Sequence, residues 1–174
     1  MDSANLVFID ESSINIGMTR LYGRAVGEER VIDYVPDVRF DRVSILSSMR
    51  LNGTLVPVTY EGTLDGALFY TYVVQCLAPT LNKGDIVIMD NASPHKIKGI
   101  VEAIEERGAY VLWLPTYSPD LNPIEQMWSK LKAHLRKAKA RTLDALYQAL
   151  NDALDLVSSS DIRGWFALAN YSVL

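Results

Sequence analysis

Two short runs of consecutive apolar residues constrain the fold of this chain more than any other feature. Residues 86–89 (IVIM) contain no polar side chain, and residues 6–9 (LVFI) follow the same pattern. Each run predicts a strand that is buried on both faces, because a strand with one face in water alternates apolar and polar residues. Strands of this kind occur in sheets that are covered by helices on both sides. We therefore expect an α/β fold.

The segments around these two runs predict a mixed sheet with helices on its faces. An antiparallel ribbon is expected from strands at 43–49 and 54–60, joined by an Asn52-Gly53 hairpin, with 24–34 as a weaker third candidate. The ribbon leads into βαβ crossovers, which gives five strands in one mixed sheet. The other predicted elements are helices at 63–79 and 95–107, a strand at 110–114, and helices at 123–139, 143–157 and 161–169.

Length and composition fit a single domain in a soluble, cytoplasmic protein. A chain of 174 residues is the size of one hydrophobic core. Its one cysteine, Cys76, lies in an apolar stretch, which excludes a disulfide framework and fits a reducing compartment. No apolar run approaches the ~18–20 residues of a membrane-spanning helix. We expect one domain over residues 1–174 and no membrane partner.

Three acidic residues, Asp10, Asp90 and Glu125, stand at the ends of predicted elements. Asp10 and Asp90 each end a buried strand, and Glu125 opens a helix. If the two strands are parallel neighbours, their carboxyl ends meet at one edge of the sheet, where α/β proteins commonly place ligands. Carboxylates from separate segments supply the hard oxygen ligands that divalent metal ions need. The trio predicts a site for two divalent cations and phosphoryl transfer on nucleic acid.

Each of these acids also has an ordinary structural interpretation. Asp10 and Asp90 are of the residue type that often closes a turn after a strand. Asn122, Pro123 and Glu125 match a helix start, with Asn as the N-cap and Glu at the third helical position. The local pattern alone supports a capping Glu125 and a metal-binding Glu125 equally.

Other polar residues near the trio are either alternative metal ligands or residues that could support the site. Glu11 lies on the opposite face of the first strand, and Asp85 stands at the far end of its strand, roughly 16 Å from the predicted site. Neither is expected to share that site. His95 could contact a phosphate, orient a water or cap a helix, and Asn91 suits a supporting hydrogen bond. Asp120 is a further auxiliary candidate, as a supporting or substitute ligand.

Basic residues crowd a segment that follows Glu125, although the net charge of the chain is −4. A basic strip beside an acidic centre suits a polyanion guided onto metal ions. A solvated helix face explains the same pattern. Trp128 is expected to lie in the core, on the apolar stripe of the same helix. The candidate nucleic-acid contacts are Lys130, Lys132, Arg136 and Lys137.

Three stretches of the chain, FIDES, DIVIMDNASPHK and VLWLPTYSPDLNPIEQMWSKLK, resemble the catalytic domain of DDE transposases. The similarity is to the mariner-like superfamily with its bacterial insertion-sequence relatives. In that branch thirty-four residues separate the second and third acids, as they separate Asp90 and Glu125. The resemblance covers residues 10 to about 141. It implies a ribonuclease-H-like fold in which Asp10, Asp90 and Glu125 hold two Mg²⁺ or Mn²⁺ ions, with Asp10 between them.

The resemblance also implies a reaction and partners. The reaction is metal-dependent cleavage of DNA at transposon ends, followed by attack of the freed 3′-hydroxyl on target DNA. Family members usually act as homodimers and carry a helix-turn-helix region before the catalytic domain. Because the first strand starts close to Met1, we expect the region that selects transposon ends on a separate part. A bacterial-type protein, associated with the nucleoid when it acts, is expected.

Two other functions fit the same residues. A related ribonuclease-H-like nuclease could use the trio on another nucleic acid, and an inactive domesticated relative could bind nucleic acid or serve in assembly. The intact trio counts against the inactive relative. No Gly-rich phosphate loop follows a strand, so the signatures of nucleotide-binding domains are absent.

Overall fold

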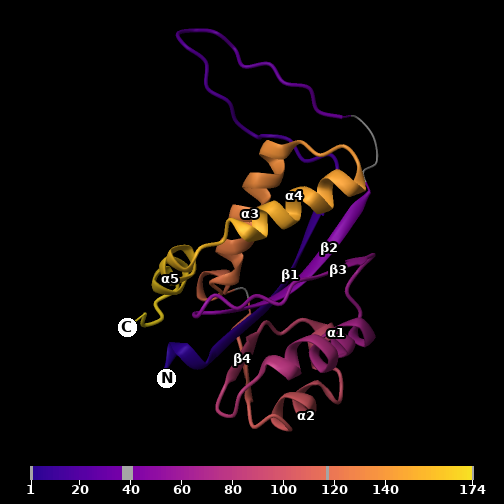
Figure 1. Cartoon of the computed structure of the whole chain (residues 1–174), viewed down its shortest axis with the longest axis vertical. Coiled ribbons are helices and arrows are strands. Elements are labelled where there is room, and N and C mark those ends of the chain that lie inside the picture. Colours follow the sequence, from indigo (N-terminus) through magenta and orange to yellow (C-terminus); the bar gives the residue numbers. More distant parts are fainter. Residues whose placement is uncertain (1, 37–40, 117, 174) are drawn as a thin grey trace.

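A computed structural model describes residues 2–36, 41–116 and 118–173 of the chain. Within these residues five strands form one mixed sheet in the order β3-β2-β1-β4-β5, which confirms the predicted sheet (Figure 1). β1 pairs antiparallel with β2 and parallel with β4, and β5 is parallel to β4. The strands are β1 (Leu6–Asn15), β2 (Arg42–Arg50), β3 (Val58–Glu61), β4 (Ile86–Met89) and β5 (Tyr110–Trp113).

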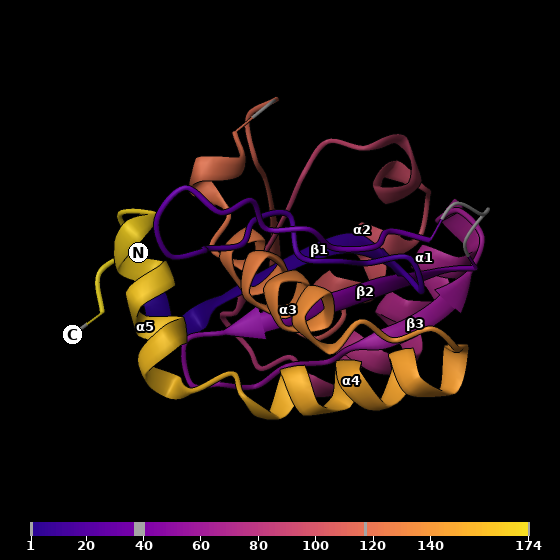
Figure 2. The same cartoon turned by 90° about the horizontal axis from the view of Figure 1, so that it is seen from above.

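Helices cover both faces of this sheet. α1 and α2 lie on one face, and α3, α4 and α5 lie on the other (Figure 1). α3 lies close to β1 in both views (Figure 2). None of the helices in the described ranges is long and apolar enough to cross a membrane. The helices are α1 (Gly66–Tyr72), α2 (Ile100–Glu105), α3 (Ile124–Ala138), α4 (Leu143–Asp155) and α5 (Ser159–Leu168).

The central strand β1 is apolar on both faces because it packs against both helical layers. Leu6 and Phe8 belong to the core shared with α3, α4 and α5, whereas Val7 and Ile9 belong to the core shared with α1 and α2. All four side chains are at most 1% exposed. Asp10 is the first polar residue of the strand and follows these four directly, although Ile14 further along β1 returns to the core.

The prediction of a further ribbon strand at 24–34 is wrong. Residues 20–36 form no regular element and extend as a long arm away from the sheet (Figure 1). The apolar side chains of Tyr22, Ile32 and Tyr34 suggested a strand, but all are more than 80% exposed. A strand forms only where a neighbour pairs its backbone groups, and both edges of β2 are already paired.

Other predicted boundaries shift for local reasons. The helix expected from Thr63 starts later, with Asp65 as its N-cap. The helix expected over 95–107 is divided, because Gly99 adopts a φ of 98° that a right-handed helix cannot contain. The strand expected from 54 begins only at Val58. The three C-terminal helices agree with the prediction to within two residues at each end.

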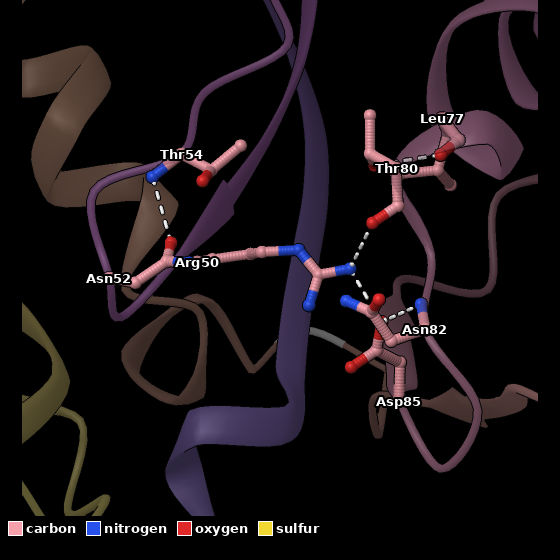
Figure 3. Close-up of polar contacts among 7 residues, drawn as sticks. All are labelled: Arg50, Asn52, Thr54, Leu77, Thr80, Asn82 and Asp85. Atoms are coloured by element: carbon pink, nitrogen blue, oxygen red, sulfur yellow. Dashed lines mark hydrogen bonds and ion pairs between the residues drawn. The ribbon is translucent and has the colours of Figure 1, made fainter.

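A buried ion pair closes the end of the sheet where β4 begins (Figure 3). The Arg50 guanidinium donates to Asp85 Oδ2 at 2.6 Å and to the Thr80 carbonyl oxygen at 3.0 Å. Asp85 Oδ2 also accepts the backbone N–H of Asn82 at 2.6 Å. Burial raises the pKa of Asp85, but the hydrogen bonds from Arg50 and Asn82 outweigh it and lower the pKa. Asp85 therefore serves the fold, away from the other end of β4.

Candidate active site

The three predicted acids meet at one edge of the sheet. Since β1 and β4 are parallel neighbours with Phe8 opposite Ile88, Asp10 and Asp90 each follow a paired position by two residues and emerge at the same edge. Glu125, in the first turn of α3, lines the same cavity of about 650 Å³, named here the acidic cavity. Its other lining residues are Asn91, Ala92, Lys96, Leu114, Pro115, Thr116, Ser118, Pro119 and Asn122.

Glu125 faces the acidic cavity at a helix start that lacks the predicted side-chain cap. The Asn122 side chain caps no N–H group of α3, whereas its backbone carbonyl oxygen accepts the Glu125 N–H at 3.1 Å. The Asn122 amide oxygen is buried and has no hydrogen-bond partner among the described residues. The capping interpretation of this segment is therefore wrong. The Glu125 side chain stays exposed at the cavity.

Asp10 is fixed by a tryptophan from α3. Trp128 Nε1 donates to Asp10 Oδ2 at 3.0 Å, and Trp128 is buried, as predicted. The hydrogen bond itself left no signal in the sequence, because the two residues are 118 positions apart. Burial and the negative charges of Glu125 and Glu11 raise the pKa of Asp10 to about 8. The carboxylates repel one another, so the cavity favours a positively charged ligand.

Asp90 is held by His95, whose side chain is 1% exposed. His95 Nδ1 lies 2.7 Å from Asp90 Oδ1, Nε2 lies 3.5 Å from Glu11 Oε2, and the ring packs against Phe69. Burial lowers the pKa of His95, but the two carboxylates outweigh it and raise the pKa to about 9. The hydrogen bond from His95 in turn lowers the pKa of Asp90. Glu11 thus reaches the site although it faces away from Asp10, a connection that the sequence pattern missed.

The two other auxiliary candidates differ in position. The side-chain N–H of Asn91 donates to the Leu114 carbonyl oxygen at 2.8 Å, so Asn91 ties together the segments that follow β4 and β5. Asn91 also lines the acidic cavity. Asp120 is exposed in a short 3-10 turn and is not among the lining residues, so its placement does not support a role as a ligand.

The acidic cavity offers oxygen donors that suit a hard divalent cation. Its carboxylates come from three separate segments, and the unpaired amide oxygen of Asn122 adds a neutral donor. In the described ranges, no three acidic, histidine or cysteine side chains stand close enough to form a metal cluster as they are placed. The donor chemistry fits Mg²⁺ or Mn²⁺, and binding requires the carboxylates to draw closer together.

The predicted basic strip divides by position. Lys130 pairs with Asp161 at the start of α5 and donates to a backbone carbonyl oxygen, so it holds helices together. Lys132 and Arg136 line cavities beside the acidic cavity. Lys137 is exposed and lines none of these cavities. None of the four predicted contacts lines the acidic cavity itself, and two of them, Lys132 and Arg136, line neighbouring cavities.

Comparisons with known proteins identify relatives of the chain. Residues 5–147 match the family model described as DDE superfamily endonuclease. The transposable element Tcb2 transposase of Caenorhabditis briggsae is 28% identical over 181 residues, which cover 92% of this chain and 63% of that protein.

Solved structures share the fold. The Mos1 transposase paired-end complex with left transposon end matches at a TM-score of 0.77 and 17% identity, over 97% of this chain and 53% of that chain. The Mos1 mariner paired-end complex with Mn matches at 0.76 and 16% identity, over 96% and 53%. The fold is ribonuclease-H-like, as the resemblance implied. The chain spans between 53% and 63% of the length of these relatives, and a nematode relative gives no support to the bacterial-type expectation.

Proposed function

Because the chain belongs to the DDE superfamily of endonucleases, we propose that it is the catalytic domain of a Tc1/mariner-type transposase. It cuts DNA at transposon ends and joins the freed 3′-hydroxyl to target DNA. The observation that carries the proposal is the meeting of Asp10, Asp90 and Glu125 around one cavity. The identity with the Tcb2 transposase and the fold shared with the Mos1 complexes support the same function.

Asp10, Asp90 and Glu125 are the proposed ligands of two Mg²⁺ or Mn²⁺ ions. When bound, such ions activate the attacking water or 3′-hydroxyl and stabilise the leaving oxygen at phosphorus. The raised pKa of Asp10 supports the proposal: burial raises it most, and the negative charges of Glu125 and Glu11, which a bound cation would offset, raise it further. The similar Mos1 mariner paired-end complex was solved with Mn, which supports the choice of metal.

The neighbouring side chains of this chain position those carboxylates. Trp128 donates to one oxygen of Asp10 and leaves the other free for the cavity. His95 holds Asp90 through Oδ1 and packs against a buried aromatic ring, which restricts the rotation of the carboxylate. Glu125 has the most freedom, since its side chain is exposed. We expect Glu125 to move most when the site assembles.

The proposed partners are transposon-end DNA, target DNA and a second copy of the chain. The described residues act as one catalytic domain, and segments outside it select the transposon ends, in line with the longer relatives. The exposed apolar side chains of the arm, among them Tyr22, Ile32 and Tyr34, suit contact with a second copy. Sedimentation of the wild-type chain and of an Ile32→Asp/Tyr34→Asp variant tests that pairing.

The function is tested with a labelled oligonucleotide duplex that carries a transposon end, incubated with the full chain and Mn²⁺ or Mg²⁺. We expect nicking and transfer of the 3′-end into a second duplex. Both reactions should disappear in Asp10→Asn, Asp90→Asn and Glu125→Gln. Asp120→Asn is the matched control, because it removes a nearby acid that does not line the cavity.

Two outcomes would contradict the proposal. Activity that survives all three substitutions would remove the trio from the mechanism. Hydrolysis of nucleic acid with no transfer of a 3′-end would instead identify a related nuclease.

A further inference from the structure

The strand β1 continues beyond the point where β4 stops. Its last pairing with β4 is Phe8 with Ile88, whereas its pairing with β2 extends to Asn15 opposite Arg42. In the part of the chain that the structure describes, no strand pairs with the second half of β1 on the side where β4 stops. The side chains at this edge are mostly polar, and they include Ser12, Ser13 and Asn15.

Two further cavities continue the acidic cavity along this edge. The first, of about 560 Å³, shares Glu125 with the acidic cavity and is lined as well by one more acid, Glu11, and by two cations, Arg42 and Lys132. The second, of about 410 Å³, shares Lys132 with the first and adds Arg136. The three cavities thus follow one another along α3, each sharing a lining residue with the next. The two cavities beyond the acidic cavity are named the basic trough.

One face of α3 forms a wall of the basic trough. Lys132 and Arg136 follow Glu125 by seven and eleven residues, which at about 100° per residue places each within about 20° of Glu125 around the helix axis. They stand about 10 and 16 Å along the axis from Glu125. Lys130 and Lys137 are turned away by roughly 120–140°. Lys132 and Arg136 therefore lie on the face of α3 toward the trough, and Lys130 and Lys137 lie on other faces.

The cations of the basic trough are unpaired. No acidic side chain of the described ranges forms an ion pair with Arg42, Lys132 or Arg136, although Lys130 and Lys139 each have an acidic partner. Lys132 and Arg136 are also partly buried, so their positions are restricted. Four cations, Arg20, Arg42, Lys132 and Arg136, line the two cavities together with two acids, Glu11 and Glu125, and both acids lie in the cavity nearer the proposed metal-binding carboxylates. The positive charge therefore increases along α3 toward Arg136, which suits an anionic ligand in a chain of net charge −4.

We propose that the basic trough binds the phosphodiester backbone of one DNA strand where that strand leaves the acidic cavity, with Arg42, Lys132 and Arg136 on successive phosphates. The inference rests on the proposed function and adds the path of the substrate. Cavities of about 300–1,000 Å³ hold ligands of drug size, so each part of the trough suits one or two nucleotides of a single strand.

The test measures binding of a fluorescein-labelled oligothymidylate of about 12 nucleotides by anisotropy, in EDTA, across a salt titration. The triple variant Arg42→Met/Lys132→Met/Arg136→Met keeps the aliphatic stems and removes the charges. We expect at least about tenfold weaker binding and a salt slope smaller by about 2, since each phosphate contact on single-stranded DNA contributes ~0.7. Lys137→Met, on the same helix, should change neither value appreciably.

An unchanged salt slope in the triple variant would overturn the inference, and so would an equal loss in Lys137→Met. Urea unfolding of each variant checks that it folds, and the single variant Lys132→Met, with an expected slope change of ~0.7, serves if the triple variant does not fold. Because EDTA removes metal ions, the binding that this assay measures requires neither metal nor cleavage. Failure of the basic trough leaves the proposed function standing, and failure of the trio in the cleavage assay leaves trough binding measurable.

Discussion

An aspartate stands at each end of β4, and the two differ in exposure and in the charges around them. At the start of the strand, Asp85 is 3% exposed and is neutralised by Arg50 at 2.6 Å. At the other end, the Asp90 side chain is 51% exposed, beside Asp10 and Glu125 at the acidic cavity. An aspartate at a strand end serves the fold where a guanidinium and backbone N–H groups satisfy it. It is available for chemistry where several carboxylates face a cavity together.

The end of β4 at Asp90 and the acidic cavity is named here the open end, and the end at Asp85 the closed end. The largest effect should come from Asp10→Asn, which tests whether the open end is less stable than it could be because its acids serve the reaction. Metal-dependent cleavage should fall by about 10³-fold or more, because several kcal/mol of charge stabilisation at phosphorus depend on the metals. The free energy of unfolding without metal should stay the same or rise, since burial and neighbouring acids oppose ionisation of Asp10 in the folded protein, and Asn keeps an oxygen acceptor for Trp128. Cleavage assays and urea unfolding measure the two effects.

A fall in both activity and stability would contradict this prediction. It would mean that the Asp10 charge supports the fold, as the Asp85 charge does. Asp120→Asn, an exposed acid outside the cavity, should change neither quantity.

At the closed end, Arg50→Met should lower the free energy of unfolding by about 3–5 kcal/mol, because it leaves the buried Asp85 charge without its partner. The activity per folded molecule should not change. The double variant Arg50→Met/Asp85→Leu should recover most of the lost stability, because no buried charge remains. A double variant as unstable as the single one would show that packing around Arg50, and not the charge, holds this end together.

Metal binding should stabilise one end only. At a Mn²⁺ concentration 100 times the dissociation constant, the free energy of unfolding should rise by about 2.7 kcal/mol. Asp10→Asn should abolish most of this gain, and Arg50→Met/Asp85→Leu should keep it. Thermal unfolding across a Mn²⁺ titration gives the comparison, and an equal gain in Asp10→Asn would place the metal elsewhere.

The two ends should also respond differently to pH. At the acidic cavity the lowered pKa of Asp90 adds stability above about pH 4, as that of Asp85 does, but two groups with raised pKa values act in the opposite direction. The pKa of Asp10 is raised to about 8, so the metal-free folded protein keeps a proton that the unfolded chain releases near pH 4, and stability falls as the pH rises through that window. His95, with its pKa raised to about 9, adds stability below pH ~6.5 that is lost as the pH rises through 9.

At the closed end, the pKa of Asp85 is lowered, so its contribution is present above about pH 4 and is lost as the pH falls below that value. Urea unfolding in EDTA between about pH 3 and 9 measures both trends. Asp10→Asn should reduce the fall in the free energy of unfolding between pH ~4 and 8, without changing the loss of stability below about pH 4. A wild-type profile that rises steadily from about pH 4 to 8 would contradict the carboxylate repulsion inferred at the open end.

The sequence predicts those parts of the molecule that local pattern determines. β1 and β4 followed from uninterrupted apolar runs, and the convergence of Asp10 and Asp90 followed from the geometry of parallel strand ends. The exposed apolar residues at 24–34 gave a wrong strand, because strand propensity does not supply a pairing partner. The prediction that the Asn122 side chain caps α3 was wrong as well, since the helix starts after Pro123 with no side-chain cap.

The interactions that distinguish the two ends could not be predicted. The bonds from Trp128 to Asp10 and from Arg50 to Asp85 join residues that are 118 and 35 positions apart. Tertiary packing alone brings these side chains together, and no spacing rule in the sequence reports it. The spacing of the basic residues from Glu125 along α3 follows from the sequence, but the cavities that they line depend on the direction in which α3 leaves the acidic cavity.

The central claim is that Asp10, Asp90 and Glu125 hold the metal ions of the reaction. A crystal structure of the chain soaked in Mn²⁺, with anomalous scattering used to locate manganese, tests it most directly. We expect two manganese peaks in the acidic cavity, each within ligand distance of these carboxylates, and no peak at Asp85. Manganese bound elsewhere, with the acidic cavity empty at saturating Mn²⁺, would contradict the claim.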